Sequence, residues 1–210
     1  DHDWYVVEMS SFQLDGTKTF KSQIGILLNI TPDHLDRYEY SMQNYVDSKF
    51  QLVQNMESSQ DFIFYREDRL IAEELAKKNV RAVLNPVSLS GDKNAVAYFD
   101  GSLMCFQSGF TVSQSDTTLK GPHNLINTMA AVTAAVKAGV SEASIKAALK
   151  TFVNAPHRLE HVATINGVDF VNDSKATNVD SVVYALGSFT NPIIWIAGGI
   201  DKGNDYDLIR

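Results

Sequence analysis

Short, almost wholly apolar runs alternate along this chain with longer segments of helical spacing, and this alternation limits the folds that it can adopt. The apolar runs cover residues 4–7, 24–30, 62–65, 81–84 and 193–197. Runs of this kind are typical of strands buried on both faces, as in parallel sheets. Helical spacing covers residues 41–56, 67–79, 124–138, 141–152 and 179–187. The alternation predicts an α/β fold with a mostly parallel sheet.

Two hairpin signals and one break subdivide this pattern. Asp100-Gly101 and Asn166-Gly167 each lie between two short apolar runs, and such dipeptides favour tight hairpin turns. Asn154-Ala155-Pro156 interrupts the chain between the two hairpins. We therefore expect two domains, residues 1–155 and residues 156–210.

The composition argues against several classes of protein. The net charge is −7, with 18 Lys and Arg against 25 Asp and Glu, so a broad basic surface for nucleic acid is not expected. No apolar run reaches the roughly 18 residues that a membrane span needs. The single cysteine, Cys105, rules out an internal disulfide and suits a reducing compartment. We expect a cytoplasmic protein and, because the chain begins at Asp1 rather than Met, a piece of a longer one.

Polar groups that suit a metal ion follow the first two apolar runs. Glu8 follows residues 4–7, and Asp33 and His34 follow residues 24–30. If both runs are parallel strands, these side chains meet at one edge of the sheet, where ligands bind in open α/β folds. Carboxylates at such an edge often hold Mg²⁺. A solvated Glu8 and a hydrogen-bonded loop histidine are the competing interpretations.

A lysine interrupts the apolar stripe of the helix expected at residues 41–56. Lys49 lies between Val46 and Leu52 on that stripe. Its stem could pack while its amine reaches water, and spacing alone favours this interpretation. Its amine could instead point into the site at the sheet edge, where burial would lower its pKa.

Three later segments are rich in hydrogen-bonding side chains. Asn124 and Asn127 share a helix face, where they could contact an adenine edge, although Asn124 also suits a helix N-cap. Arg158 could bind phosphate or pair with Glu160. Residues 172–178 form a strand-to-helix turn with more polar groups than capping requires.

Five segments stand in a defined order: EMSSFQL (8–14), TPDHLDRY (31–38), GPHNLIN (121–127), PHRLE (156–160) and NDSKATN (172–178). Their order and spacing resemble the Mur ligases, the ATP-dependent amide-forming enzymes of peptidoglycan synthesis, over essentially the whole chain. The resemblance implies an N-terminally truncated central ATP-binding domain over 1–155 and the start of a Rossmann-like C-terminal domain over 156–210. The family's UDP-binding domain, phosphate loop and distal C-terminal part are not in this sequence, so the piece alone is expected to be inactive.

The resemblance also assigns roles to individual residues. Two Mg²⁺ ions are implied, with Lys49 carbamylated, and their ligands are Glu8, His34 and Lys49. The implied ATP contacts are Asn124, Asn127, His157, Arg158 and Asp173. The implied contacts to the two other substrates are Ser10, Lys175, Thr177 and Lys202. The implied catalytic residues are His34, Lys49 and Lys175.

The motifs NDSKATN and EMSSFQL favour one branch of the family. That branch joins D-glutamate to UDP-N-acetylmuramoyl-L-alanine through an acyl phosphate, and we expect it to act as a monomer. Another amide-forming ligase, such as a different Mur ligase or a folylpolyglutamate synthase, is the nearest alternative. A non-catalytic nucleotide-binding module is the alternative of a different class.

Overall fold

The larger sheet has parallel strands at its centre and an antiparallel extension. The computed structural model describes residues 2–119, 121–199 and 206–209. Within them, six strands lie in the order in which they occur in the sequence: β1 (Ile24–Leu27), β2 (Asp61–Tyr65), β3 (Val83–Ser88), β4 (Ala97–Phe99), β5 (Leu103–Phe106) and β6 (Thr111–Ser113). Strands β1 to β4 pair in parallel, and β5 and β6 add antiparallel pairings. The predicted α/β fold with a mostly parallel sheet is confirmed.

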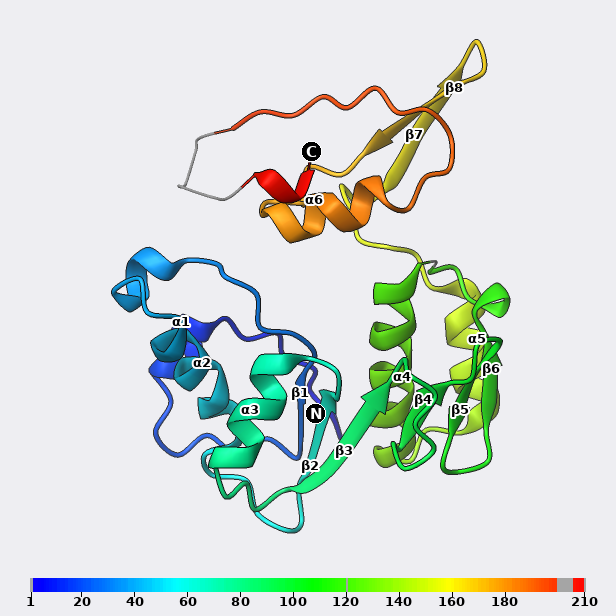
Figure 1. Ribbon diagram of the computed structural model, residues 1–210. Coiled ribbons are helices and arrows are strands. Elements are labelled where there is room, and N and C mark those ends of the chain that lie inside the picture. Colours follow the sequence, from blue (N-terminus) through cyan, green and yellow to red (C-terminus); the bar gives the residue numbers. More distant parts are fainter. Residues whose placement is uncertain (1, 120, 200–205, 210) are drawn as a thin grey trace.

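Helices cover both faces of this sheet (Figure 1). One side carries α1 (Ser11–Asp15), α2 (Met42–Phe50) and α3 (Arg69–Lys77). The other side carries α4 (Pro122–Lys137), which contacts β2 to β5, and α5 (Glu142–Thr151), which packs on α4. Short 3-10 turns lie at η1 (Leu35–Tyr38), η2 (Gln51–Val53) and η3 (Gln114–Asp116). The sheet is thus the middle layer of three.

Strand β2 divides the interior into two cores. Its side chains alternate between the faces, as the period of two in a strand requires. Phe62 and Phe64 belong to the core under α2 and α3, and Ile63 belongs to the core under α4. All three are at most 7% exposed. Burial of one such side chain stabilises the fold by about 1.5–3 kcal/mol.

Side-chain caps fix where the helices begin. Ser41, Asp68 and Ser141 each accept a hydrogen bond from the backbone three residues ahead and start α2, α3 and α5. The helix expected at 41–56 ends earlier, because after Phe50 the chain tightens into η2. The strand expected at 81–84 lies slightly later, as β3, and β6 had no sequence signal of its own.

Two predicted strands are wrong. Residues 4–7 and 193–197 are not in a strand, and their large side chains are exposed, with Val6 and Ile194 more than nine-tenths exposed. A short apolar run becomes a buried strand only when a neighbouring ladder and a covering helix exist. Neither segment has them here, so Glu8 does not stand at the end of a sheet strand either.

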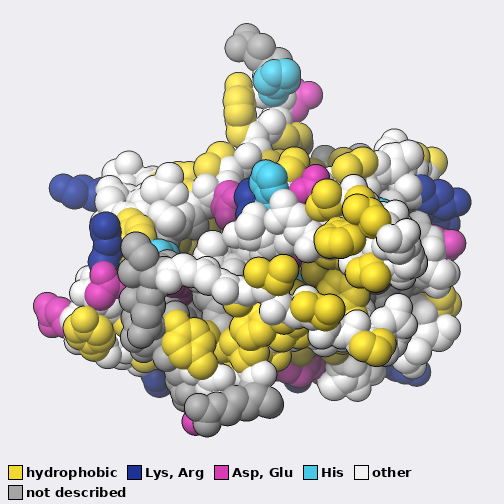
Figure 2. Space-filling model, turned by 90° about the horizontal axis from the view of Figure 1, so that it is seen from above, with side chains coloured by type: hydrophobic (Ala, Val, Ile, Leu, Met, Phe, Trp, Pro, Cys, Tyr) yellow, Lys and Arg dark blue, Asp and Glu magenta, His cyan; other side chains and the backbone are white. Residues whose placement is uncertain are grey.

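The C-terminal part of the described chain, called the C-terminal unit below, has its own two-stranded sheet. It contains the hairpin of β7 (Glu160–Ile165) and β8 (Val168–Asn172), then α6 (Val179–Leu186) and η4 (Asp207–Ile209). Hydrophobic side chains gather on the face seen in Figure 2, and Val162, Phe170 and Trp195 of this unit are about half exposed or more. The domain boundary at residue 155 stays a prediction. No described helix is long and apolar enough to cross a membrane.

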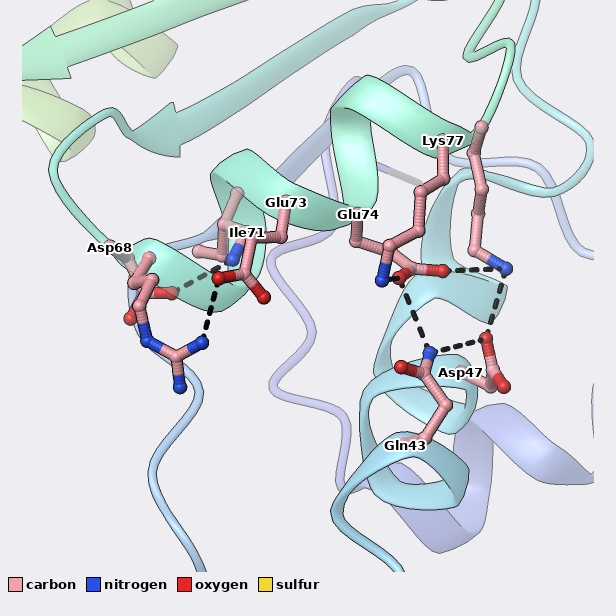
Figure 3. A network of polar contacts seen from close by, with 9 residues as sticks. Gln43, Asp47, Asp68, Ile71, Glu73, Glu74 and Lys77 are labelled. Carbon is pink, nitrogen blue, oxygen red and sulfur yellow. Dashed lines mark hydrogen bonds and ion pairs between the residues drawn. The ribbon is translucent and has the colours of Figure 1, made fainter.

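A buried carboxylate joins α3 to α2 (Figure 3). Glu74 is 3% exposed. It receives hydrogen bonds from Gln43 (3.2 Å) and Lys77 (3.4 Å), and lies 3.0 Å from the amine of Lys78. Lys78 also reaches Asp47 on α2 at 3.0 Å. Burial alone raises the pKa of the Glu74 carboxyl, but the bonds from Lys78 and Gln43 outweigh it and hold that pKa below its usual range.

We expect Glu74→Gln to lower the free energy of unfolding at pH 7 by about 1–3 kcal/mol, because two lysines lose a buried charged partner. The depressed pKa means that this stabilisation is complete above the unfolded carboxyl pKa of about 4.3 and is lost as the pH falls through the lower folded value. Urea unfolding of both proteins at pH 7 and at about pH 3 measures the difference.

The neighbouring acid supplies the control. Glu73 is exposed and pairs with Arg69 at 2.7 Å, so Glu73→Gln makes the same chemical change outside the buried network. Such a surface pair is worth about 0.3–0.5 kcal/mol. Equal losses for the two variants, or a Glu74→Gln loss that does not shrink in acid, would contradict a stabilising role for the network.

Candidate functional site

Helix α2 and the loop after β1 bring a lysine, an aspartate and a histidine together. Lys49 and Tyr45 lie four residues apart on one face of α2, and the Lys49 amine is 4.9 Å from the centre of the Tyr45 ring. Asp33 and His34 come from the loop, with 3.6 Å between the Asp33 carboxylate and Nε2 of His34. Phe12 of α1 contacts the His34 ring at 5.3 Å. We call these five residues the lysine cluster.

Burial and one carboxylate set the electrostatics of the lysine cluster. Burial lowers the pKa of the Lys49 amine, and the nearby Asp33 carboxylate opposes that shift. Burial, then Asp33 and Tyr38, raise the pKa of the Tyr45 hydroxyl to about 12. Lys49 therefore combines an amine held against an aromatic ring with a weakened preference for the charged form. This arrangement differs from a lysine that merely extends its amine into water.

A line of hydroxyl groups fixes α1 against α2 beneath this cluster. The Tyr38 hydroxyl contacts Asp15 at 3.0 Å and Ser48 at 3.1 Å, and Ser48 donates to the carbonyl of Ser11 at 3.0 Å. Ser10 begins α1 as the N-cap of a capping box with Gln13. The Ser10 hydroxyl is thus already committed to the helix, and its predicted contact to substrate stays a prediction.

Glu8 does not join the lysine cluster. It is exposed in the extended N-terminal segment, which makes no strand. Within the ranges that the structure describes, no group of three or more His, Cys, Asp and Glu side chains is placed to hold a metal ion. Of the predicted metal ligands, His34 and Lys49 each lie near the Asp33 carboxylate.

A second feature is a large cavity of about 950 Å³ between the central sheet and the C-terminal unit. Four residues predicted from the sequence line it: Asn124, Asn127, Arg158 and Asp173. The amide of Asn127 donates to Asn124 Oδ1 at 3.3 Å, so the two do share a face of α4. The N-cap residue of α4 is Gly121, with φ of 89°. Asn124 is therefore not the N-cap, which was the competing interpretation of this residue.

Charged groups meet at the wall of the cavity formed by the C-terminal unit. Asp173 accepts a hydrogen bond from the backbone of Leu159 at 2.9 Å, which fixes the acid beside the turn that carries Arg158. Glu160, the alternative partner of Arg158, instead accepts from the backbone N–H of His157 at 2.7 Å.

Sequence reasoning missed His123, which also lines the cavity. Burial, then the nearby Arg158, lower the pKa of its imidazole, and Asp173 opposes the shift. Its ring contacts Tyr184 of α6 at 5.4 Å. The polar segment at 121–127 marked the region, but only the packing of α6 on the start of α4 distinguishes this side chain.

The remaining predicted residues lie in the turn at 172–178 and beside it. The His157 ring contacts Asn172 at 2.8 Å, and its carbonyl accepts from the backbone of Lys175 at 3.0 Å, so His157 holds the turn without lining the cavity. Asn178 caps α6. The side chains of Lys175 and Thr177 are exposed. Lys202 lies outside the described residues.

Comparison with known proteins agrees with these motifs. The Mur ligase middle domain matches residues 1–135. The UDP-N-acetylmuramoylalanine–D-glutamate ligase of Bacteroides thetaiotaomicron is 46% identical over 215 residues, which cover 100% of this chain and 48% of that protein. The ligase of the same name from Cytophaga hutchinsonii is 50% identical over 212 residues, covering 99% and 47%. The chain thus spans about half the length of these relatives.

The fold has solved counterparts as well. The MurF ligase of Thermotoga maritima, crystallised in complex with ADP, matches 80% of this chain and 40% of its own with a TM-score of 0.56. The sequence identity is 17%, so this likeness concerns the fold. Because the middle-domain match covers more than half of the chain and close relatives align with all of it, the chain belongs to the Mur ligase family.

Proposed function

We propose that this protein is an ATP-dependent ligase that joins D-glutamate to UDP-N-acetylmuramoyl-L-alanine in peptidoglycan synthesis. The observation that carries the proposal is the 46–50% identity, over the whole chain, to two proteins that bear this name. We further propose that residues 1–155 are the central ATP-binding domain and 156–210 the start of the C-terminal domain, in a monomeric, cytoplasmic enzyme.

The cavity suits the nucleotide. Its volume of about 950 Å³ lies within the usual range for small-molecule sites. The paired amides of Asn124 and Asn127 offer the donors and acceptors that an adenine edge requires. Arg158 and Asp173 offer a cation for phosphate and an acceptor for a sugar hydroxyl, and His157 positions the turn that carries Asp173. The related MurF ligase binds ADP with the same fold.

The lysine cluster suits a divalent cation only after a covalent change. A lysine amine does not bind Mg²⁺, which prefers oxygen ligands. Carbamylation of Lys49 by CO₂ would give it two oxygens beside His34 and Asp33, and the burial that lowers its pKa increases the neutral amine that this reaction needs. That Glu8 binds Mg²⁺, and that a second Mg²⁺ ion is present, are further expectations. Bound Mg²⁺ would neutralise part of the negative charge of the phosphates.

Two chemical steps follow from the proposed substrates. The carboxylate of UDP-N-acetylmuramoyl-L-alanine attacks the γ-phosphate of ATP, which gives an acyl phosphate and ADP. The D-glutamate amine then attacks the acyl carbon, and phosphate leaves. Arg158 would neutralise the phosphate chain, which lowers the repulsion between two anions. Ser10 would contact the muramoyl substrate, and Lys175, Thr177 and Lys202 would bind D-glutamate.

Substrate choice distinguishes this ligase from its relatives. The full-length protein, given ATP and UDP-N-acetylmuramoyl-L-alanine, should release ADP with D-glutamate but not with L-glutamate or meso-diaminopimelate. ADP release with another amino acid would identify a different Mur ligase. No release with any of them would favour a non-catalytic nucleotide-binding module.

Removal of the Lys49 amine should abolish most of the turnover. We expect Lys49→Ala in the full-length protein to lower the rate at least about 100-fold, by analogy with losses at metal-site residues. A small added carboxylate, such as acetate, should restore part of the rate by supplying the missing oxygens. Lys150→Ala, which changes an exposed lysine of α5, is the control. Near-normal turnover of Lys49→Ala would contradict the proposed carbamylation of Lys49.

Arg158 should act chiefly on the nucleotide. We expect Arg158→Ala to raise the KM for ATP about 10–100-fold, because a charge-assisted contact to phosphate is lost. Arg81, an exposed arginine that does not line the cavity, supplies the matched Arg81→Ala control. A change in the KM for D-glutamate alone would show that Arg158 serves the other substrate.

A further inference from the structure

One acidic side chain of the cavity has no role in the function proposed above. Glu67 follows strand β2 and lines the cavity with Tyr65, at the edge from which the loops of β1 and β3 also leave. The carboxyl edge of a parallel sheet is where ligands bind in this class of fold. Glu67 is exposed, so neither burial nor a helix cap explains its presence there.

Three donors from the end of β3 hold the Glu67 carboxylate in place. Its Oε1 accepts the hydroxyl of Ser88 at 2.5 Å and that of Ser90 at 2.9 Å, and its Oε2 lies 3.4 Å from the backbone N–H of Leu89. Ser88 is fully buried. A solvated surface acid needs no such support, whereas a binding group gains affinity when its geometry is fixed in advance.

The carboxylate keeps unused capacity on one oxygen. A carboxylate has about four acceptor positions and no donor when ionised. Oε1 already takes two hydroxyls, and Oε2 takes one long backbone bond, so Oε2 remains able to accept a strong bond. A ligand group that donates a hydrogen bond, such as a hydroxyl, could bind to Oε2.

The neighbouring acid, Asp68, has a structural role. Its Oδ1 accepts the backbone N–H of Ile71 at 2.9 Å and its Oδ2 accepts that of Ile30 at 3.1 Å. Asp68 therefore fixes the start of α3 to the loop after β1, a role that Glu67 does not have.

Glu67 also lies near the part of the cavity assigned to the nucleotide. It is close enough to Tyr65 to raise the pKa of that hydroxyl, as is Tyr184, although burial is the larger cause. Tyr184 in turn contacts His123, which is influenced by Arg158 and Asp173. Glu67 and Asp173 thus face the same space from opposite parts of the chain.

We propose that Glu67 is a further nucleotide-binding residue, whose carboxylate accepts a hydrogen bond from a ribose hydroxyl of the bound nucleotide. The proposal rests on the nucleotide site proposed above. The two adjacent hydroxyls of a ribose offer two donors, and Glu67 and Asp173 offer two acceptors. The proposed function assigns the paired asparagines to the base, and an ionised carboxylate, which only accepts hydrogen bonds, suits the hydroxyls of the sugar.

Deoxynucleotides test the proposal by calorimetry on the full-length protein. Wild type should bind ADP about tenfold more tightly than at least one of 2′-deoxy-ADP and 3′-deoxy-ADP, as expected for a hydrogen bond to a charged acceptor. One of these deoxynucleotides lacks the hydroxyl that Glu67 accepts. Glu67→Ala should bind ADP about as weakly as wild type binds that deoxynucleotide, and should no longer distinguish it from ADP. Glu67→Gln, which retains a weaker acceptor, should lie between them.

Glu73→Gln is the matched control, because Glu73 is an exposed acid of α3 that does not line the cavity. Thermal unfolding of each variant separates loss of folding from loss of binding. The ribose assignment is overturned if Glu67→Ala weakens all three nucleotides equally, if it changes none, or if its effect follows the base amino group in a comparison with inosine diphosphate. Absence of ADP binding by folded wild type would instead refute the nucleotide site itself.

Discussion

The burial of β2 on both faces is the constraint on which the remaining structure depends. Because Phe62 and Phe64 face one core and Ile63 the other, the strand cannot shift by one residue without turning every side chain to the wrong layer. Its parallel pairing with β1 and β3 then sends three loops out at one edge. The loops carry His34, Glu67 and Ser90, and Ser88 is the last residue of β3. The strand register that places side chains in the two cores therefore also places these polar side chains at one edge of the sheet.

The Asp68 carboxylate fixes the position of the loop that follows β1. Asp68 begins α3 through the backbone N–H of Ile71 and holds the loop after β1 through that of Ile30. The loop that follows Ile30 reaches two places. Thr31 lines the cavity, and two residues later Asp33 enters the lysine cluster. One short loop therefore contributes to both the cavity and the lysine cluster.

The sequence predicted the elements whose signals are local. The run at 62–65, the two hairpins and the Ser141 cap depend on neighbours within a few residues, and the structure has all of them. The apolar runs at 4–7 and 193–197 failed because burial requires partners that a run does not contain. The same limit applies to the site.

Among the site residues, Asn124 and Asn127 could be paired by helical spacing, and the structure places them together. Lys49 was recognisable as a polar residue on an apolar stripe. His123 and Glu67 were not selected, because a histidine before an asparagine and an acid after a strand are both ordinary in loops. Their positions depend on α6 packing on α4 and on buried Ser88, which are contacts between distant segments.

Two histidines of the candidate sites have a left-handed backbone conformation. His34 and His157, both selected from sequence, have φ of 52° and 66°, in the left-handed region that costs a non-glycine residue about 1–3 kcal/mol. Such a cost persists only where surrounding contacts over-determine the conformation. For His34 these are Asp33 and the ring of Phe12, and for His157 they are Asn172 and the backbone of Lys175. Each histidine thus fastens its own loop to a second part of its site, the first in the lysine cluster and the second at the turn that carries Asp173.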